Sequence, residues 1–332
     1  MFSSLFAIAK NSFAELIRQP IYAILVGVGV ALIALSPVIA MFTLMSGEKM
    51  VVDMGLATIL LMGLVLAVLN ASQIISREID VKTAGTVISK PVGRLMFVLG
   101  KFLGVTAGML VAAFLFIATL IMTLRIGVPE AAWVRLDYPA MLALIGAVFL
   151  SCIIGVHCNY FYRWSFSSTA ILSAIPIFAL SLGLLFIVNS RWQFDWMPLS
   201  FLMNNTYEVF LAAVLVFLGT WLISSVAVAA STRLNVVPNV AVCGAVFFLG
   251  MVSRYLFGPQ VYGQYSMWIS VPASVFYHAV PNMQAFWVAD QLMQPEPYVP
   301  LSYVGTVAAY TAAYVGAMVA LSAFLFERRE LI

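Results

Sequence analysis

Eight apolar stretches, each about 20 residues or longer, dominate this chain of 332 residues. A helix needs roughly 20 residues to cross the ~30 Å hydrocarbon core of a bilayer. Because lipid offers the backbone no hydrogen-bonding partner, stretches of this length form helices there. The sequence therefore predicts an all-α, polytopic integral membrane protein with about eight transmembrane helices. The predicted spans are residues 21–45, 54–75, 95–124, 139–162, 169–189, 207–230, 237–257 and 301–326.

The composition excludes a soluble globular protein. Hydrophobic residues make up 64% of the chain and charged residues only 9%, whereas soluble domains are about one quarter charged. The centres of the predicted spans contain no Asp, Glu, Lys or Arg, and Arg125, Glu208 and Arg254 stand at span ends, where long side chains can reach headgroups. Buried ionisable groups are typical of proton-coupled carriers, so the sequence argues against a secondary carrier.

Basic residues are distributed unevenly between the two sides of the predicted spans. Cytoplasmic loops carry an excess of Lys and Arg. If the N-terminus is cytoplasmic, eleven of the 16 basic residues fall on the inner side: Lys10, Arg18, Arg77, Lys82, Lys90, Arg94, Lys101, Arg163, Arg233, Arg328 and Arg329. We therefore predict that both termini are cytoplasmic, which requires an even number of spans.

Residues 2–18 are amphipathic rather than uniformly apolar. Apolar residues recur there every three or four positions, with Lys10, Asn11 and Glu15 between them, and Pro20 follows. This pattern predicts a helix that lies in the membrane interface. The alternative is a simple extension of the first span.

The longest connection on the outer side is residues 258–300, which is rich in Tyr and Trp. Aromatic residues at this density are typical of the headgroup region. Within it, residues 281–293 could form a short amphipathic helix capped near Asn282. No soluble segment is large enough to fold alone, so residues 1–332 are predicted to form a single transmembrane domain.

Motifs for catalysis, metal binding and cofactor binding are missing from the sequence. No G-x4-G-K-[ST] loop is present, so the chain is not expected to hydrolyse ATP by that route. Cys152, His157 and Cys158 point in different directions on a helix and cannot converge on a metal. The three cysteines are expected to pack as small hydrophobic residues. We expect a chain that is not itself an enzyme.

Residues 76–101 form the one strongly polar passage in the first 120 residues. They contain five basic residues and two acids between two predicted spans. The helix of the second span can continue to Lys90, with Glu78 and Lys82 paired at i, i+4, until Pro91 stops it. Such an elbow is suited to docking against a cytoplasmic protein. Equally, the charges could reflect only the general basicity of inner loops.

The wording of this passage, E-I-D-x-K-T-x-x-T-V-I-S-K-P-V-x-R followed by L-G-K, resembles the cytoplasmic coupling segment of type-2 ABC exporter permeases (the ABC-2 family, NosY-like branch). Two further stretches are similar to the same family: residues 229–250 with S-T-R-L-N, and Pro281, Asn282 and Phe286 together with the terminal F-E-R-R-E-L. The matching positions in the first motif are Glu78, Lys82, Thr83, Thr86, Ser89, Lys90, Pro91, Val92, Arg94, Gly100 and Lys101.

The resemblance implies a permease subunit that exports an unidentified substrate across a bacterial cytoplasmic (inner) membrane. Two permease subunits, identical or different, would pair, and cytoplasmic ABC ATPase subunits that hold ATP and Mg would bind beneath them. No nucleic-acid partner is expected. Residues 76–94 would form the coupling segment, and its candidate ATPase contacts are Arg77, Glu78, Lys82, Thr83, Lys90, Pro91 and Arg94. Family members commonly have six spans, so the additional pair is expected within residues 139–189.

Gly100, Gly104 and Gly108 recur every four residues on the third predicted span. Small residues at this spacing let two helices approach closely. We expect packing within the chain or, alternatively, a subunit interface.

A second functional hypothesis is a membrane scaffold or assembly factor that moves no solute. It would recruit a cytoplasmic partner or an outer-face protein, and its support is the length of residues 258–300.

Overall fold

The computed structural model describes residues 2–42, 47–80, 94–128, 137–195, 206–262, 267–292, 294 and 298–327. This part of the chain includes eight helices that are long and apolar enough to cross a membrane. Each overlaps one predicted span, which confirms an all-α polytopic membrane protein. They are α2 (Pro20–Ala40), α3 (Gly47–Asp80), α5 (Arg94–Ile126), α6 (Tyr138–Tyr162), α7 (Phe166–Leu185), α9 (Thr206–Ser231), α10 (Val236–Tyr262) and α13 (Leu301–Glu327).

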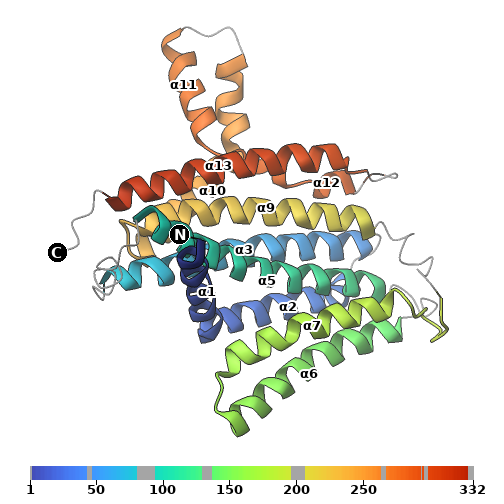
Figure 1. The fold of residues 1–332 in the computed structure, drawn as a ribbon. Coiled ribbons are helices and arrows are strands. Elements are labelled where there is room, and N and C mark those ends of the chain that lie inside the picture. Colours follow the sequence, from blue (N-terminus) through green and yellow to red (C-terminus); the bar gives the residue numbers. More distant parts are fainter. Residues whose placement is uncertain are drawn as a thin grey trace.

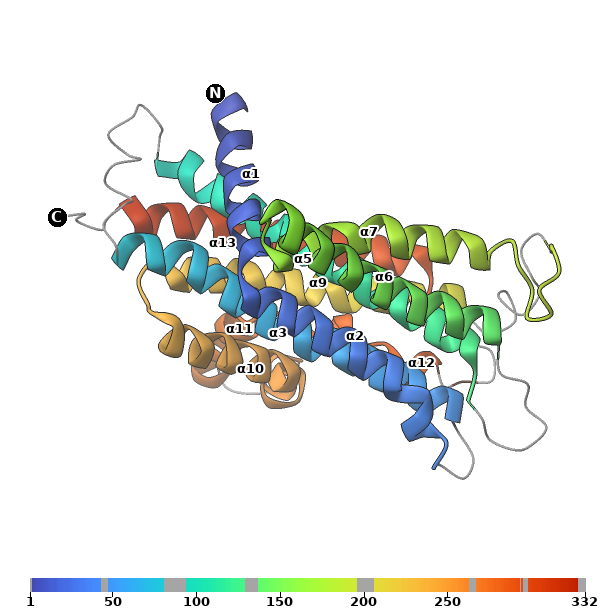
Figure 2. The same ribbon diagram turned by 90° about the horizontal axis from the view of Figure 1, so that it is seen from below.

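The spanning helices form a bundle with α3, α5 and α9 at its centre (Figures 1 and 2). In α9, 78% of the most apolar stretch is buried, compared with 28% in α13 and 22% in α10. The α6–α7 pair forms the edge opposite α13. The C-terminal ends of α3 and α13 and the N-terminal end of α5 lie at the same end of the bundle (Figure 1). We call it the inner end because it is predicted to face the cytoplasm.

Helix α1 (Phe2–Arg18) is a separate element that runs across the bundle instead of extending α2 (Figure 2). The break falls at Gln19, whose backbone is extended, and Pro20 begins α2. Proline is favoured in the first turn of a helix, where its missing N–H is not needed. The alternative of a continuous first span is therefore wrong.

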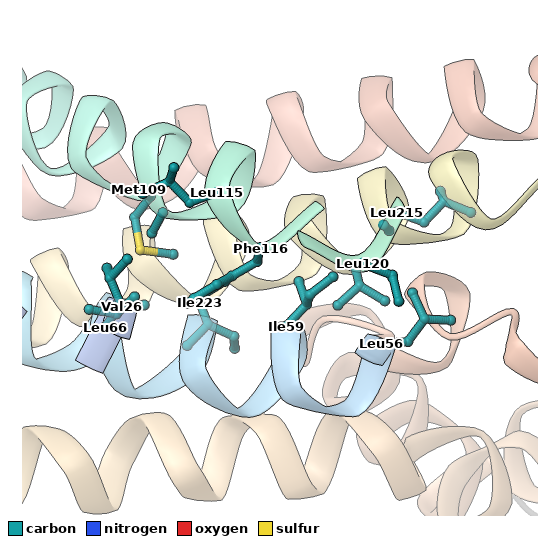
Figure 3. Packing of buried hydrophobic residues seen from close by; sticks show 14 of the residues in the cluster. Val26, Leu56, Ile59, Leu66, Met109, Leu115, Phe116, Leu120, Leu215 and Ile223 are labelled. Carbon is teal, nitrogen blue, oxygen red and sulfur yellow. The ribbon is translucent and has the colours of Figure 1, made fainter. Parts of the chain in front are cut away.

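Close contacts between small and large side chains hold the central helices together. A Cβ atom at Gly29 would lie 2.4 Å from the Phe116 ring, and one at Gly63 would lie 2.6 Å from Cγ2 of Thr220. In lipid, helices associate through such packing because moving apolar side chains out of hydrocarbon brings no gain. Figure 3 shows the resulting core, which is built from Val26, Leu56, Ile59, Leu66, Met109, Leu115, Phe116, Leu120, Leu215 and Ile223.

Most buried hydroxyl groups in the bundle bond to their own helix. Thr119 donates to Leu115 O at 2.7 Å, and Thr220 donates to Phe217 O at 2.8 Å. These bonds satisfy polar groups that would be costly to leave unpaired in hydrocarbon. Other polar side chains join different helices: Trp221 Nε1 donates to Thr106 Oγ1 (3.0 Å), and Asn239 Nδ2 donates to Ser72 Oγ (2.8 Å).

At the outer end, a buried ion pair fastens α6 and α7 to α5. Arg125 Nε donates to Asp137 Oδ2 at 2.9 Å, and both side chains are buried. The other carboxylate oxygen of Asp137 caps α6 by accepting from Ala140 N, while Arg125 also donates to the Leu185 and Val188 carbonyls at the end of α7. The expectation that Arg125 reaches the headgroups is wrong, because its guanidinium group instead binds Asp137 and the carbonyl groups at the end of α7.

Residues 258–300, the predicted outer-face loop, include several helical segments in the part that the structure describes. They contain the end of α10, then α11 (Met267–Ala279), the 3₁₀ helix η1 (Met283–Phe286) and α12 (Ala289–Leu292). A Cβ at Gly219, in the middle of α9, would lie 2.9 Å from the Phe286 ring. The chain therefore folds back into the bundle. Asn282 caps η1 by accepting from Gln284 N, so its predicted capping role is confirmed.

Glu208, which the sequence also placed at a span end, accepts from the Val299 amide at 3.3 Å. This contact joins the start of α9 to the residues before α13. The carboxylate therefore contributes to packing at the outer end.

We expect Gly63→Ala to destabilise the protein, because the added methyl group meets the β-branched Thr220 side chain. Overpacking of this kind costs about 1–3 kcal/mol. Gly27→Ala is the matched control, since nothing lies within 4 Å of its Cβ position. Thermal unfolding in detergent should show a lower Tm for the first variant only. Equal Tm values would contradict the close α3–α9 contact.

We also expect Arg125→Met to destabilise the protein strongly. Removing one partner of a buried ion pair costs about 3–5 kcal/mol because the other charge stays buried. Asp137→Asn should recover part of this loss in the double variant, since Asn retains the helix cap. A double-mutant cycle of detergent melting curves measures the coupling, and simple additivity would exclude the ion pair.

Candidate functional site

The predicted coupling segment joins the C-terminal end of α3 to the N-terminal end of α5. Arg77 and Glu78 belong to the last turns of α3, and Arg94 is the first residue of α5. Their side chains fall outside the described residues, as do Lys82, Thr83, Lys90 and Pro91 entirely. The proposed contacts of these seven residues therefore stay predictions.

Both helices that flank the coupling segment belong to the centre of the bundle. Helices α3 and α5 pack against each other, and both pack against α9. Gly55 of α3 faces Leu120 of α5 so closely that a Cβ would lie 2.3 Å from a leucine methyl carbon. A displacement at the inner ends of α3 and α5 would consequently act on the best-packed part of the molecule.

Helix α1 packs on α5 along the predicted glycine stripe, which consists of Gly100, Gly104 and Gly108. Cβ atoms at Gly100, Gly104 and Gly108 would lie 2.7, 2.5 and 2.8 Å from side-chain atoms of Ile8, Ser12 and Leu16, respectively. Both sets of residues recur every four positions, so a ridge of α1 fits a groove of α5. The described contacts of the stripe therefore lie within the chain.

Tyr22 locks the corner between α1 and α2 onto the same surface. It is fully buried, and its hydroxyl donates to the Gly108 carbonyl at 2.7 Å. Gly108 thus makes two contacts: Leu16 of α1 packs where a side chain would otherwise lie, and Tyr22 of α2 bonds to its backbone carbonyl. The first 22 residues are anchored to α5 at this point.

Lys101, on the part of α5 that α1 covers, makes both charged and aromatic contacts. The amine is buried and lies 4.0 Å from Glu15 Oε2 and 5.7 Å from the centre of the Phe97 ring. Phe97 stacks on Phe326 near the end of α13, with ring centres 5.5 Å apart. The first turns of α5 therefore contact both the N-terminal and the C-terminal helix.

Sequence reasoning missed several residues of this assembly. The sequence pattern did not single out Ser12, which is fully buried against Gly104. The available signal was its spacing of four residues from Ile8 and Leu16, which matches the glycine spacing. Nothing in the sequence pattern marked Tyr22, because its partner is a backbone carbonyl 86 positions away.

An apolar groove of about 670 Å³ lies between α2 and the α6–α7 pair. Its lining is made almost wholly of aliphatic and aromatic side chains from α2, α5, α6 and α7. Ser151, a polar exception, bonds to Ala147 O in its own helix. A molecule in this groove would contact almost only apolar side chains, an environment that suits an acyl chain.

No model of a known protein family matches this chain, and no curated protein sequence matches it. The function must therefore be inferred from the residues and their arrangement.

We expect Gly104→Leu to separate α1 from α5, because even a Cβ at this position would lie 2.5 Å from Ser12 Cβ and 2.9 Å from the Ala9 carbonyl. A Ser12→Cys reporter, in a background without the three native cysteines, measures the separation by its reaction with N-ethylmaleimide. Labelling should be slow where Gly104 is retained and fast in the Gly104→Leu variant. Gly146→Leu, at a position with open space, should leave labelling slow, and equal rates throughout would contradict the α1–α5 contact.

Proposed function

We propose that this protein is the membrane-spanning permease subunit of an ABC exporter of the ABC-2 type. A separate cytoplasmic ATPase would bind the coupling segment, residues 76–94, and hold the ATP and Mg. A second permease subunit would complete the translocation path. This assignment rests on the sequence resemblance of the coupling segment, and the membrane would be the bacterial cytoplasmic membrane.

The observation that supports the proposal best is the position of the helices on either side of the segment. Helices α3 and α5 are central, and glycine contacts couple them to each other and to their neighbours. A push on the segment would be delivered directly to packed helices, which move as rigid bodies because cores resist gradual deformation. A loop between peripheral helices would transmit much less of such a displacement to the core of the bundle.

In the proposed mechanism, closure of the ATPase dimer displaces the coupling segment and tilts α3 and α5. Helix α1 would move with α5, since the glycine stripe and Tyr22 fasten it there. The contact between Phe97 and Phe326 would pass the motion to α13. The path for the substrate would open between the two permease subunits.

The scaffold hypothesis is the alternative function, and its original support was the length of residues 258–300. Part of that stretch packs inside the chain: Phe286 is buried, and Gln284 Nε2 donates to Met251 O at 2.7 Å. A protein that only recruits an outer partner would not need this arrangement.

We expect the tagged chain, purified in detergent from its native membrane, to retain a P-loop ATPase in equal amount. Glu78→Lys with Arg94→Glu should abolish both this retention and the ATP turnover that depends on the permease, because the charges at the proposed interface are reversed. Quantitative mass spectrometry and phosphate release measure the two effects.

The matched control reverses two exposed charges on the outer turn, Arg191→Glu with Asp195→Lys. It should leave ATPase retention unchanged, since an outer-face site cannot meet a cytoplasmic protein. Retention of an outer-face protein without any ATPase would favour the scaffold. Unchanged ATPase binding by the Glu78 and Arg94 variant would exclude the coupling segment as the contact.

A further inference from the structure

A pocket of about 770 Å³ lies where the α6–α7 turn meets the C-terminal end of α1. The two segments lie side by side in both views of the molecule (Figures 1 and 2). Arg18 comes from α1 and Arg163 from the turn, and Ser168, Thr169 and Ser173 of α7 also line the pocket. Ile154 and Leu172 give the pocket an apolar wall. The pocket thus combines cationic, hydrogen-bonding and hydrocarbon surfaces.

The charge of this pocket is entirely positive. Its lining contains two arginines and no carboxylate. Across the part of the chain that the structure describes, neither arginine forms an ion pair. Glu15, one turn before Arg18, faces Lys101 instead. Arginine recognises phosphate through paired N–H groups, so the complementary ligand is a phosphate-bearing anion.

The α6–α7 turn holds Arg163 in an unusual backbone conformation. Its φ angle is +56°, in the left-handed region, and its N–H bonds to Cys158 O. Glycine is the usual residue at this position after a helix. Asn159 Nδ2 donates to Trp164 O at 2.7 Å and so fixes the turn further. The turn therefore holds the backbone of Arg163 in one defined conformation.

The surroundings of the pocket match the headgroup layer of a membrane. Tyr160, Phe161, Tyr162 and Trp164 are all strongly exposed around the turn, and amphipathic aromatic residues concentrate at membrane–water interfaces. The turn belongs to the inner end of the bundle, where anionic lipids give the cytoplasmic leaflet a negative surface potential. The apolar wall can receive the first part of an acyl chain.

We propose that this pocket binds an anionic phospholipid of the inner leaflet, with its phosphate between Arg18 and Arg163. The bound lipid connects the α6–α7 pair to α1, which in turn is seated on α5. The proposal does not depend on the exporter function, because the pocket is formed within this chain alone.

Native mass spectrometry of the delipidated full-length protein tests the site with dioleoylphosphatidylglycerol. The wild-type protein should hold this lipid in preference to dioleoylphosphatidylcholine. The variant Arg18→Gln with Arg163→Gly should bind it at least about tenfold more weakly, since each basic residue near a phosphate contributes about a factor of five. Glycine accepts the left-handed conformation, so this variant should fold and melt like the wild type.

The control, Lys10→Gln with Arg233→Gln, removes the same charge from exposed positions outside the pocket. It should bind phosphatidylglycerol as the wild type does. Equal binding of both lipids, or an equal loss in both double variants, would overturn the proposal. Displacement of phosphatidylglycerol by millimolar inorganic phosphate would assign the pocket to a soluble phosphate compound and would also overturn it.

Discussion

The bundle depends on one physical constraint: in lipid, helices must approach closely to gain any packing energy at all. Hydrocarbon solvates an apolar side chain as well as another helix does, so only tight fits and hydrogen bonds favour association. The structure meets this constraint by placing glycines directly against side chains of neighbouring helices. Gly29 receives Phe116, Gly55 receives Leu120, and Gly63 receives Thr220.

Helix α5 gathers most of these contacts and therefore has the leading part in the proposed coupling. It meets α1 through three glycines, α9 through the Trp221 hydrogen bond and α13 through the Phe97 ring. Such an element responds as a unit when its end is displaced. The proposed role of residues 76–94 gains its physical meaning from this arrangement, because the segment ends where α5 begins.

The two ends of the bundle use their charges differently. At the outer end, Arg125 binds Asp137 and the carbonyl groups at the end of α7, all within the chain. At the inner end, Arg18 and Arg163 face a shared pocket that contains no carboxylate. The first arrangement closes the α6–α7 pair onto α5. The second leaves positive charge available to an anion, which is the basis of the proposed lipid site.

The sequence by itself determined the helical fold, the eight spans and the separate amphipathic helix α1, because each rests on local periodicity and on the length of a bilayer. It also marked Gly100, Gly104 and Gly108 as a packing surface. Only the tertiary structure decided that α1 occupies this surface, that Arg125 pairs with Asp137, and that residues 281–286 fold back into the bundle. These outcomes depend on contacts between positions far apart in the chain. Hydrophobic periodicity describes which face of a helix is apolar, but it carries no information about which neighbour will cover that face.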